Sequence, residues 1–188
     1  MQHFDNLDIV IKPPEIALYY GGFLRHMSGQ IKSGDWHSKA VSLDNLFKYT
    51  ACIKRFRYNF SWEETGVYQL SMDWIAQHGS LDGYTTLEEI KHRYQQIDRL
   101  YRQINLERRI KPAWLLHPDN PVLCASDGIL IHVGPDGRQF FGAGGIHRMA
   151  ICHLLGLQTS PAQLGCVHPD GITSVDVMRP KQHRPLSV

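Results

Sequence analysis

The sequence has no apolar stretch that approaches the length of a transmembrane helix, which requires about 20 residues. Residues 1–8 also lack the basic patch and the following apolar run that together mark a signal peptide. These two absences argue against a membrane-spanning or exported protein. We therefore expect a cytoplasmic protein that has no membrane partner.

Cysteine is sparse, and no two cysteines have the C-x-x-C spacing of a redox motif or a zinc-ligand pair. Because two of them lie in apolar stretches, we expect small buried thiols rather than metal ligands. His147 and His153 would face different sides of a predicted helix, which disfavours a zinc site. The sequence therefore predicts no metal centre built from these side chains. The scattered cysteines are Cys52, Cys124, Cys152 and Cys166.

Neither sign of charge dominates the chain, since 20 basic and 18 acidic side chains leave a net charge of +2. A strongly basic balance would indicate a nucleic-acid partner, so this composition disfavours nucleic acid without excluding a local basic patch. The 188 residues, of which 43% are hydrophobic, suffice for one domain with a full core. The oligomeric state stays open.

The first part of the chain gives mixed signals. We expect a short strand at residues 9–11, which ends at Pro13-Pro14 because proline cannot donate to a sheet. Residues 15–26 are expected to form a short helix, although Gly21-Gly22 weakens that prediction. From Ser42 onward, apolar residues recur at steps of three and four, which predicts a helix.

Two capping boxes predict the starts of two further helices. The first box is Ser61-Trp62-Glu63-Glu64, and its helix is expected to stop at Gly79. The second box, Thr86-Leu87-Glu88-Glu89, is expected to open the longest helix of the chain. That segment should close at Lys111-Pro112, because a residue before proline disfavours the helical conformation.

The back half is expected to contain a strand pair across a tight turn, a glycine-rich turn that opens a helix, and a closing strand. We therefore expect an α+β fold in which residues 1–188 form a single compact domain, with residues 1–85 mainly helical. The expected segments are strands at 128–133, 138–141 and 162–168, a turn at 134–137, a helix that ends near Gly156, and a mobile tail at 178–188.

The most informative segment is Phe-Gly-Ala-Gly-Gly-Ile-His-Arg at residues 141–148. The start of a helix offers free backbone N–H groups and a positive dipole end, which favours an anion such as a phosphate. Glycines would let a ligand approach the backbone closely, Arg148 adds a planar fork for phosphate oxygens, and His147 titrates near neutral pH. The alternative is an ordinary strand-to-helix turn in which both side chains are exposed or cap the helix. The predicted nucleotide-binding residues of this segment are Gly142, Gly144, Gly145, Ile146, His147 and Arg148.

The order of elements from residue 86 to residue 168 carries a family resemblance. A helix ends at Lys111-Pro112, a strand pair turns at Pro135-Asp136-Gly137, and Gly145-Ile146-His147-Arg148 stands at the start of the next helix. The segment Leu154-Leu155-Gly156-Leu157 then precedes a closing strand. This arrangement resembles the ParB/sulfiredoxin superfamily. The resemblance implies a nucleotide-binding core of short mixed strands and helices, with the helical N-terminal half packed on it.

The residues at the helix start distinguish the branches of that superfamily. Sulfiredoxins carry a catalytic cysteine where this chain has Ile146, and isoleucine has no thiolate to serve as a nucleophile. ParB clamps bind CTP, usually carry two arginines where this chain has His147-Arg148, and continue into a helix-turn-helix domain, for which residues 169–188 are too few. Free serine kinases carry a His-Arg pair and phosphorylate a small hydroxyl compound from an adenine nucleotide. The resemblance fits that branch best.

Phosphoryl transfer requires positioned phosphates, a bridging Mg²⁺ ion and a base for the acceptor hydroxyl. We expect Arg148 to neutralise charge on the transferred group and His147 to contact a phosphate oxygen or the leaving group. Asp35, in a loop, and Glu64 are the candidate carboxylates, although Glu64 could instead only cap its own helix. Lys111 could reach the nucleotide or only offset a helix dipole.

These residues predict a nucleotide-binding protein that acts as an ATP- or ADP-dependent phosphotransferase, that is, a kinase for a small hydroxyl metabolite. Mg²⁺ is the expected cofactor, and CTP is another possible nucleotide. One alternative is a nucleotide-sensing regulator without turnover, or a ParB-like protein that binds nucleic acid. A second alternative is a scaffold that has kept the glycine-rich turn only for its fold. The acceptor is not identified by the sequence.

Overall fold

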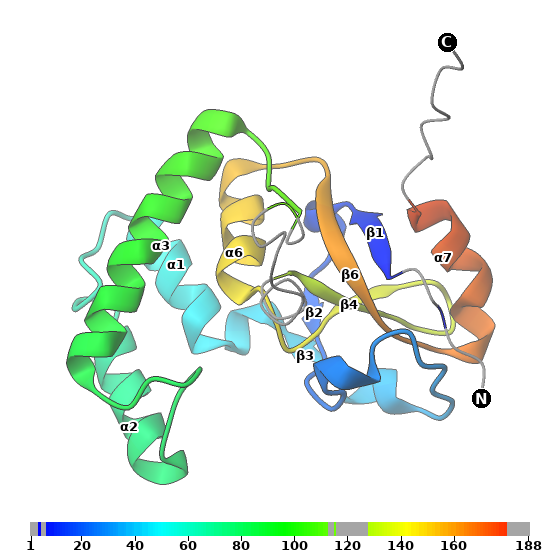
Figure 1. Cartoon of the computed structure of the whole chain (residues 1–188), viewed down its shortest axis with the longest axis horizontal. Coiled ribbons are helices and arrows are strands. Elements are labelled where there is room, and N and C mark those ends of the chain that lie inside the picture. Colours follow the sequence, from blue (N-terminus) through cyan, green and yellow to red (C-terminus); the bar gives the residue numbers. More distant parts are fainter. Residues whose placement is uncertain (1–3, 5–6, 113–114, 116–127, 180–188) are drawn as a thin grey trace. The chain divides into compact units, whose positions relative to one another are not determined.

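A computed structural model describes residues 4, 7–112, 115 and 128–179 of the chain (Figure 1). The fold belongs to the predicted α+β class. The chain divides into two compact units. Unit 1 contains residues 1–41, 111–145 and 158–188, and unit 2 contains residues 42–110 and 146–157. The predicted single domain stays a prediction, and each unit is described by itself.

Unit 1 is built around a six-stranded mixed sheet with the strand order β1-β6-β4-β5-β2-β3. Its centre is the parallel pair of β4 and β6, in which Ile131 faces Leu164. All four residues of β4 are buried, as expected for a central strand with a nearly continuous apolar sequence. Helix α7 packs against β1 and β4. The bounds are β1 (Asp8–Ile11), β2 (Leu18–Tyr19), β3 (Val41–Ser42), β4 (Leu130–Val133), β5 (Gln139–Phe141), β6 (Ser160–Val167) and α7 (Ile172–Met178).

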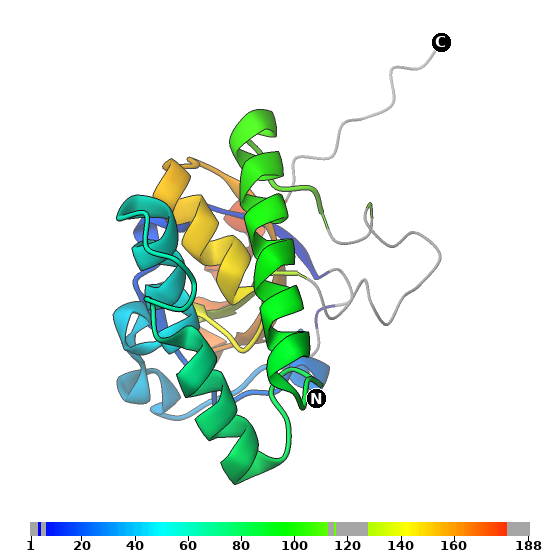
Figure 2. The ribbon, with the colours of Figure 1, turned by 90° about the vertical axis from the view of Figure 1, so that its left-hand side faces the viewer.

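Unit 2 is helical. Figures 1 and 2 both show α3 and α6 side by side, and α6 also packs against α1. The capping box of Thr86 and Glu89 opens α3 as predicted, since each residue's side chain accepts from the backbone N–H of the other. Helix α2 stops at Gly79, which has a positive φ of 85° and therefore suits glycine. The bounds are α1 (Phe47–Arg57), α2 (Val67–His78), α3 (Leu87–Glu107) and α6 (Ile146–Leu155).

Several expectations for the two ends of the chain are wrong. Residues 15–26 contain β2 and a 3-10 turn at Arg25–Met27 instead of a helix, because Tyr19 pairs with Phe141 of β5. The chain before Val41 thus contributes β1 and β2 to the sheet. The α-helices of the segment 1–85, which was predicted to be mainly helical, begin only with α1 at Phe47. Helix α7 was not expected from the sequence. Of the predicted mobile tail, residues 180–188 lie outside the described residues.

Three of the four cysteines fall within the described residues, and all three are buried and outside disulfides, which confirms the expectation of small buried thiols. They are Cys52, Cys152 and Cys166. Burial raises the pKa of the Cys166 thiol to about 11, so a thiolate is disfavoured there. Cys124 lies outside the described residues. Among the described helices, none is long and apolar enough to cross a membrane.

Candidate functional site

The glycine-rich turn follows β5 and bonds back to the first residue of β4. Gly142 donates its N–H to the carbonyl of Leu130 at 2.7 Å, and Leu130 donates to the carbonyl of Gly144 at 3.3 Å. Gly144 also donates to the carbonyl of Gly142 at 2.9 Å. These bonds hold the turn against β4. Gly145 follows in the left-handed region, with a φ of 77°.

The space beside these glycines is filled by the protein itself, so close packing is a further reason for glycine, and the close approach of a ligand stays a prediction. A Cβ on Gly142 would lie 2.7 Å from Nε2 of His132. A Cβ on Gly145 would lie 2.8 Å from the Cα of Ile129, so the backbone there needs glycine for close packing as well as for its φ. At Gly144 the nearest group is the guanidinium of Arg25. Packing thus accounts for all three glycines.

Arg25 is the residue that sequence reasoning missed at this turn. Its Nη2 donates to the carbonyl of Gly128 at 2.8 Å, and its Nη1 donates to the amide oxygen of Gln163. Both of these acceptors are neutral, and they hold the guanidinium directly over Gly144. No spacing in the sequence indicates this position, because Arg25 comes from a segment that was expected to be a helix and lies over 100 residues before the turn.

The first turn of α6, in unit 2, contains His147 and Arg148. His147 is only 6% exposed, so the alternative in which this imidazole points to solvent is wrong. The Tyr94 ring meets the imidazole edge to face, with ring centroids 5.7 Å apart. Nε2 of His147 is buried and has no hydrogen-bond partner among the described residues. Arg148 is half-buried.

The electrostatic surroundings keep His147 neutral. Burial lowers its pKa well below the usual value, and the positive charges of Arg93, Lys48 and Arg148 lower the pKa further. A neutral imidazole can donate one hydrogen bond and accept another, but at neutral pH it is a poor proton donor to a leaving group. The expected contact of His147 with a phosphate oxygen is therefore compatible with its state, whereas general-acid catalysis is not favoured.

The two candidate carboxylates have different surroundings. Glu64 accepts the backbone N–H of Ser61 at 2.7 Å, and Ser61 Oγ accepts the backbone N–H of Glu64 at 3.2 Å, which is the predicted capping box. These bonds lower the pKa of Glu64, which makes it a weaker base. Asp35 is exposed, and its Oδ1 lies 3.3 Å from Nε2 of His37. Asp35 belongs to unit 1 and Glu64 to unit 2.

A buried aromatic cluster connects the Asp35 loop to the glycine-rich turn within unit 1. Trp36 is 6% exposed and packs on His132, with ring centroids 6.3 Å apart. His132 accepts the N–H of Cys166 at its Nδ1, and its Nε2 lies beside Gly142. Burial lowers the pKa of His132 to about 4, so it is neutral. The sequence did not single out His132, whose apolar neighbours indicate only that it belongs to a buried strand.

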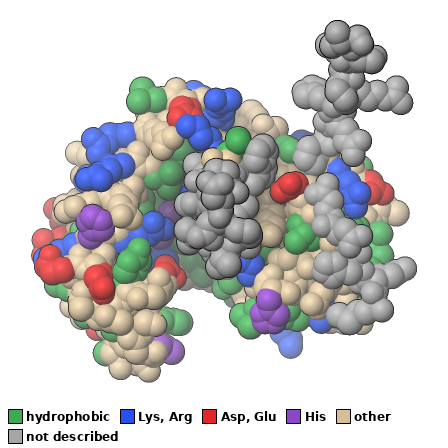
Figure 3. All heavy atoms as spheres, viewed as in Figure 1, with side chains coloured by type: hydrophobic (Ala, Val, Ile, Leu, Met, Phe, Trp, Pro, Cys, Tyr) green, Lys and Arg blue, Asp and Glu red, His purple; other side chains and the backbone are tan. Residues whose placement is uncertain are grey.

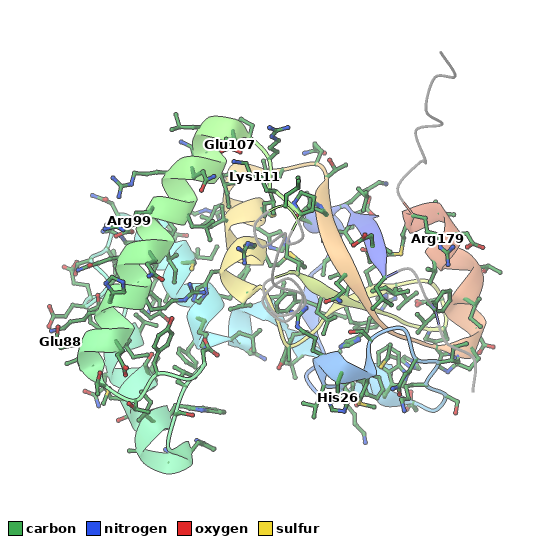
Figure 4. All side chains as sticks on the ribbon, viewed as in Figure 1. His26, Glu88, Arg99, Glu107, Lys111 and Arg179 are labelled. Atoms are coloured by element: carbon green, nitrogen blue, oxygen red, sulfur yellow. The ribbon has the colours of Figure 1, made fainter. Side chains whose placement is uncertain are left out.

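Lys111 is half-buried and follows the end of α3, which lies at Glu107 (Figure 4). The helix ends four residues before the predicted boundary, because Arg108 adopts the left-handed conformation with a φ of 53°. Lys111 belongs to unit 1. Its role in nucleotide binding stays a prediction.

Comparison of the chain with protein-family models, curated proteins and solved structures finds no significant match. The resemblance to the ParB/sulfiredoxin superfamily therefore stays a prediction that depends on the quoted motifs. Within the part of the chain that the structure describes, no group of three or more His, Cys, Asp or Glu side chains is placed to hold a metal ion. A Mg²⁺ ion held by the described residues would therefore take most of its ligands from substrate phosphates and waters.

Proposed function

We propose that this chain binds the phosphate groups of a nucleotide at the first turn of α6 and transfers a phosphoryl group to a small hydroxyl metabolite. The observation that carries the proposal is the combination, in one helical turn, of the helix N-terminus, the Arg148 guanidinium and Nε2 of His147, which is buried and has no hydrogen-bond partner in the described part of the chain. A buried polar atom without a partner in a native protein calls for an explanation, and a ligand supplies one.

Each of these groups has a defined part in phosphoryl transfer. The N–H groups at the start of α6 and the Arg148 fork would hold phosphate oxygens and offset charge in the transition state. His147 would donate a hydrogen bond from a neutral imidazole. ATP or ADP is the preferred nucleotide, with CTP as the alternative, and bound Mg²⁺ would neutralise phosphate charge. Asp35 is the remaining carboxylate candidate for the base, because Glu64 is engaged in its capping box.

A regulator that senses a nucleotide without turnover is the second candidate. It is favoured by one observation, namely that Glu64, one of the two carboxylates proposed as a base, is engaged in reciprocal hydrogen bonds with Ser61. Such a protein would bind the nucleotide stoichiometrically and leave it unchanged. A ParB-like nucleic-acid binder would instead lose affinity steeply with salt, and the net charge of +2 gives that option little support.

Isothermal titration calorimetry with ATP, ADP and CTP, each with and without Mg²⁺, tests the binding. We expect Arg148→Ala to weaken nucleotide binding at least about tenfold, because a charge-assisted contact to phosphate contributes roughly 1.5–3 kcal/mol. Arg99→Ala is the matched control, since Arg99 is exposed and projects outward from α3 (Figure 4). Wild-type protein that binds none of the three nucleotides, or equal affinity in Arg148→Ala, would refute the proposal.

Turnover separates the kinase from the sensor. Incubation of the wild-type chain with labelled ATP or ADP and a panel of small hydroxyl metabolites should give a labelled product if the chain is a kinase. Tight nucleotide binding with no labelled product from any acceptor would favour the sensor.

A further inference from the structure

The charged side chains of unit 2 are separated by sign. Helix α1 contains four Lys and Arg residues and no acid, and residues 99–109 contain four arginines and one glutamate. Residues 61–90, which include α2, contain six acids and neither Lys nor Arg. In Figure 3, Lys and Arg side chains predominate over the upper part of α3, and Asp and Glu side chains lie around its lower end. The nearly neutral charge of the whole chain therefore does not describe this part of the surface.

Two side-chain contacts join the basic end of α1 to the basic half of α3. Arg55 binds the Asp98 carboxylate at two points, with Nε 3.1 Å from Oδ1 and Nη2 3.4 Å from Oδ2. The rings of Phe56 and Tyr101 stack in parallel, with centroids 4.0 Å apart. These contacts place the end of α1 beside α3 and make one surface of the two helices.

Arg55 also positions an exposed aromatic residue that follows α1. Its Nη1 donates to the carbonyl of Phe60 at 3.1 Å, so Phe60 lies next to the Arg55–Asp98 pair. Phe60 is 42% exposed, and Tyr58, two residues earlier, is 61% exposed. Because covering an aromatic ring is favourable, two rings left open to solvent beside arginines offer contact area to a partner.

Two arginines of α3 supply positive charge at the same place. Arg102 donates from Nε to the carbonyl of Asp98 at 3.3 Å, which places its guanidinium beside the Arg55–Asp98 pair. Arg99 is exposed and projects outward (Figure 4), and among the described residues it makes neither a hydrogen bond nor an ion pair. Asp98 is the one acid in this group and is already bound to Arg55. The basic-aromatic face consists of Arg55, Tyr58, Phe60, Arg99 and Arg102.

We propose that the basic-aromatic face binds single-stranded nucleic acid. The arginines of α3 contact backbone phosphates, and the rings of Tyr58 and Phe60 stack on bases. A duplex keeps its bases paired and stacked on one another, and an acidic peptide has no bases, so neither would use the two rings in this way. The inference goes beyond the proposed function, since it uses neither the first turn of α6 nor a mononucleotide.

Fluorescence anisotropy with labelled oligo(dT) and oligo(rU) of roughly 16 nucleotides tests the face. We expect binding that weakens as salt rises, because contacts to phosphates release counterions. The two oligonucleotides distinguish DNA from RNA as the source of the strand. A duplex of equal length, polyglutamate and vesicles that contain phosphatidylserine should each bind at least about tenfold more weakly. Equal or tighter binding of any of these three, or no binding of either oligonucleotide, would overturn the proposal.

The arginine and aromatic contributions are separable by the salt dependence of binding. Arg102→Ala should make the slope of log K against log salt less negative by about 0.7, because one phosphate contact to a single strand is lost. Lys91→Ala is its control on the same helix, since Lys91 pairs with Glu88 at 3.2 Å outside the face, and its slope should equal that of wild type. An unchanged slope in Arg102→Ala would contradict the phosphate contact.

Substitution of the rings tests stacking. Phe60→Ala should weaken oligonucleotide binding at least about fivefold and leave the salt slope unchanged, because a neutral ring releases no counterion. Trp74→Ala is the matched control, since Trp74 is 44% exposed and lies in the segment that contains only acids, and it should stay within about twofold of wild type. Tyr58→Ala provides a second ring variant if Phe60→Ala does not fold. Equal losses in Trp74→Ala and the ring variants would refute stacking at this face.

Two further variants separate this inference from the proposed function. Arg99→Ala should weaken oligonucleotide binding and leave ATP binding unchanged, whereas Arg148→Ala should do the reverse. Oligonucleotide binding without ATP binding would overturn the proposed function alone, and ATP binding without oligonucleotide binding would overturn the face alone. Oligonucleotide binding that is lost in Arg148→Ala but kept in Arg99→Ala and Arg102→Ala would place the strand elsewhere and also overturn the face.

Discussion

Gly145 shows how one residue can be required for two physical reasons. Its φ of 77° costs any L-residue about 1–2 kcal/mol, and a Cβ would also lie 2.8 Å from the Cα of Ile129. Gly156 is the matched comparison, because its φ is 61° and a Cβ there would meet nothing within 4 Å. We expect Gly156→Ala to lower the free energy of unfolding by about 1 kcal/mol and Gly145→Ala by clearly more.

Urea unfolding of both variants measures this difference. Equal losses would show that the backbone beside Gly145 moves away without cost, and the account of close packing would then be wrong. The sequence made the importance of Gly145 predictable, since glycine clusters before a helix are informative. It could not show that the reason includes contact with Ile129, because that contact joins the turn before α6 to the residue before β4.

The helix start at Thr86 was predicted correctly, because its capping box depends on residues three positions apart and is visible in the sequence. The reciprocal hydrogen bonds of Ser61 and Glu64 also form, but the helix predicted to start there begins only at Val67, after Gly66. Residues 15–26 were predicted wrongly because the strand Leu18–Tyr19 depends on pairing with β5, which follows it by more than 100 residues. Tyr94 and His147 likewise come from different helices, and their ring contact cannot be read from spacing.

The capping box also decides what a substitution at Glu64 should do. Glu64→Gln keeps an oxygen that can accept the N–H of Ser61 but removes the carboxylate. We expect this variant to retain its thermal stability and, if the chain is a kinase, its turnover. Asp35→Asn should instead lower kcat by at least about a hundredfold if Asp35 is the base, with little change in nucleotide affinity.

The measurements are thermal unfolding, steady-state turnover and nucleotide titration of both variants. A hundredfold loss of kcat in Glu64→Gln, with its stability intact, would assign the base to Glu64 and contradict the capping interpretation. Unchanged turnover in Asp35→Asn would exclude Asp35 as the general base.

At the scale of the molecule, the two units are not contiguous in the sequence. Helix α6 lies between β5 and β6 in the chain, yet it groups with α1, α2 and α3 in unit 2. The sequence placed this helix within a core of residues 86–168, because chain order was the only guide to proximity. The α+β class was predictable from the periodicities, whereas the grouping of elements depends on contacts between distant segments.

Among the described residues, each unit contains one buried neutral histidine, and stability should therefore depend on pH. The pKa of His132 in unit 1 is lowered to about 4, and that of His147 in unit 2 is also well below its usual value. In the unfolded chain both imidazoles take up a proton near pH 6.5. The unfolded state therefore binds more protons, and stability that is present above pH 6.5 is lost as the pH falls toward 4.

For His132 alone we expect a loss of roughly 2 kcal/mol in the free energy of unfolding between pH 7 and pH 5. Urea unfolding at both pH values should show a smaller loss in His132→Gln, since glutamine can still accept the N–H of Cys166 but does not titrate. His26→Gln is the control, because His26 is exposed and its replacement should leave the pH dependence as in wild type. If His132→Gln loses as much stability on acidification as wild type, the buried imidazole is not a source of acid sensitivity. Its Nε2 must then gain a partner on protonation that offsets the cost of burying the charge.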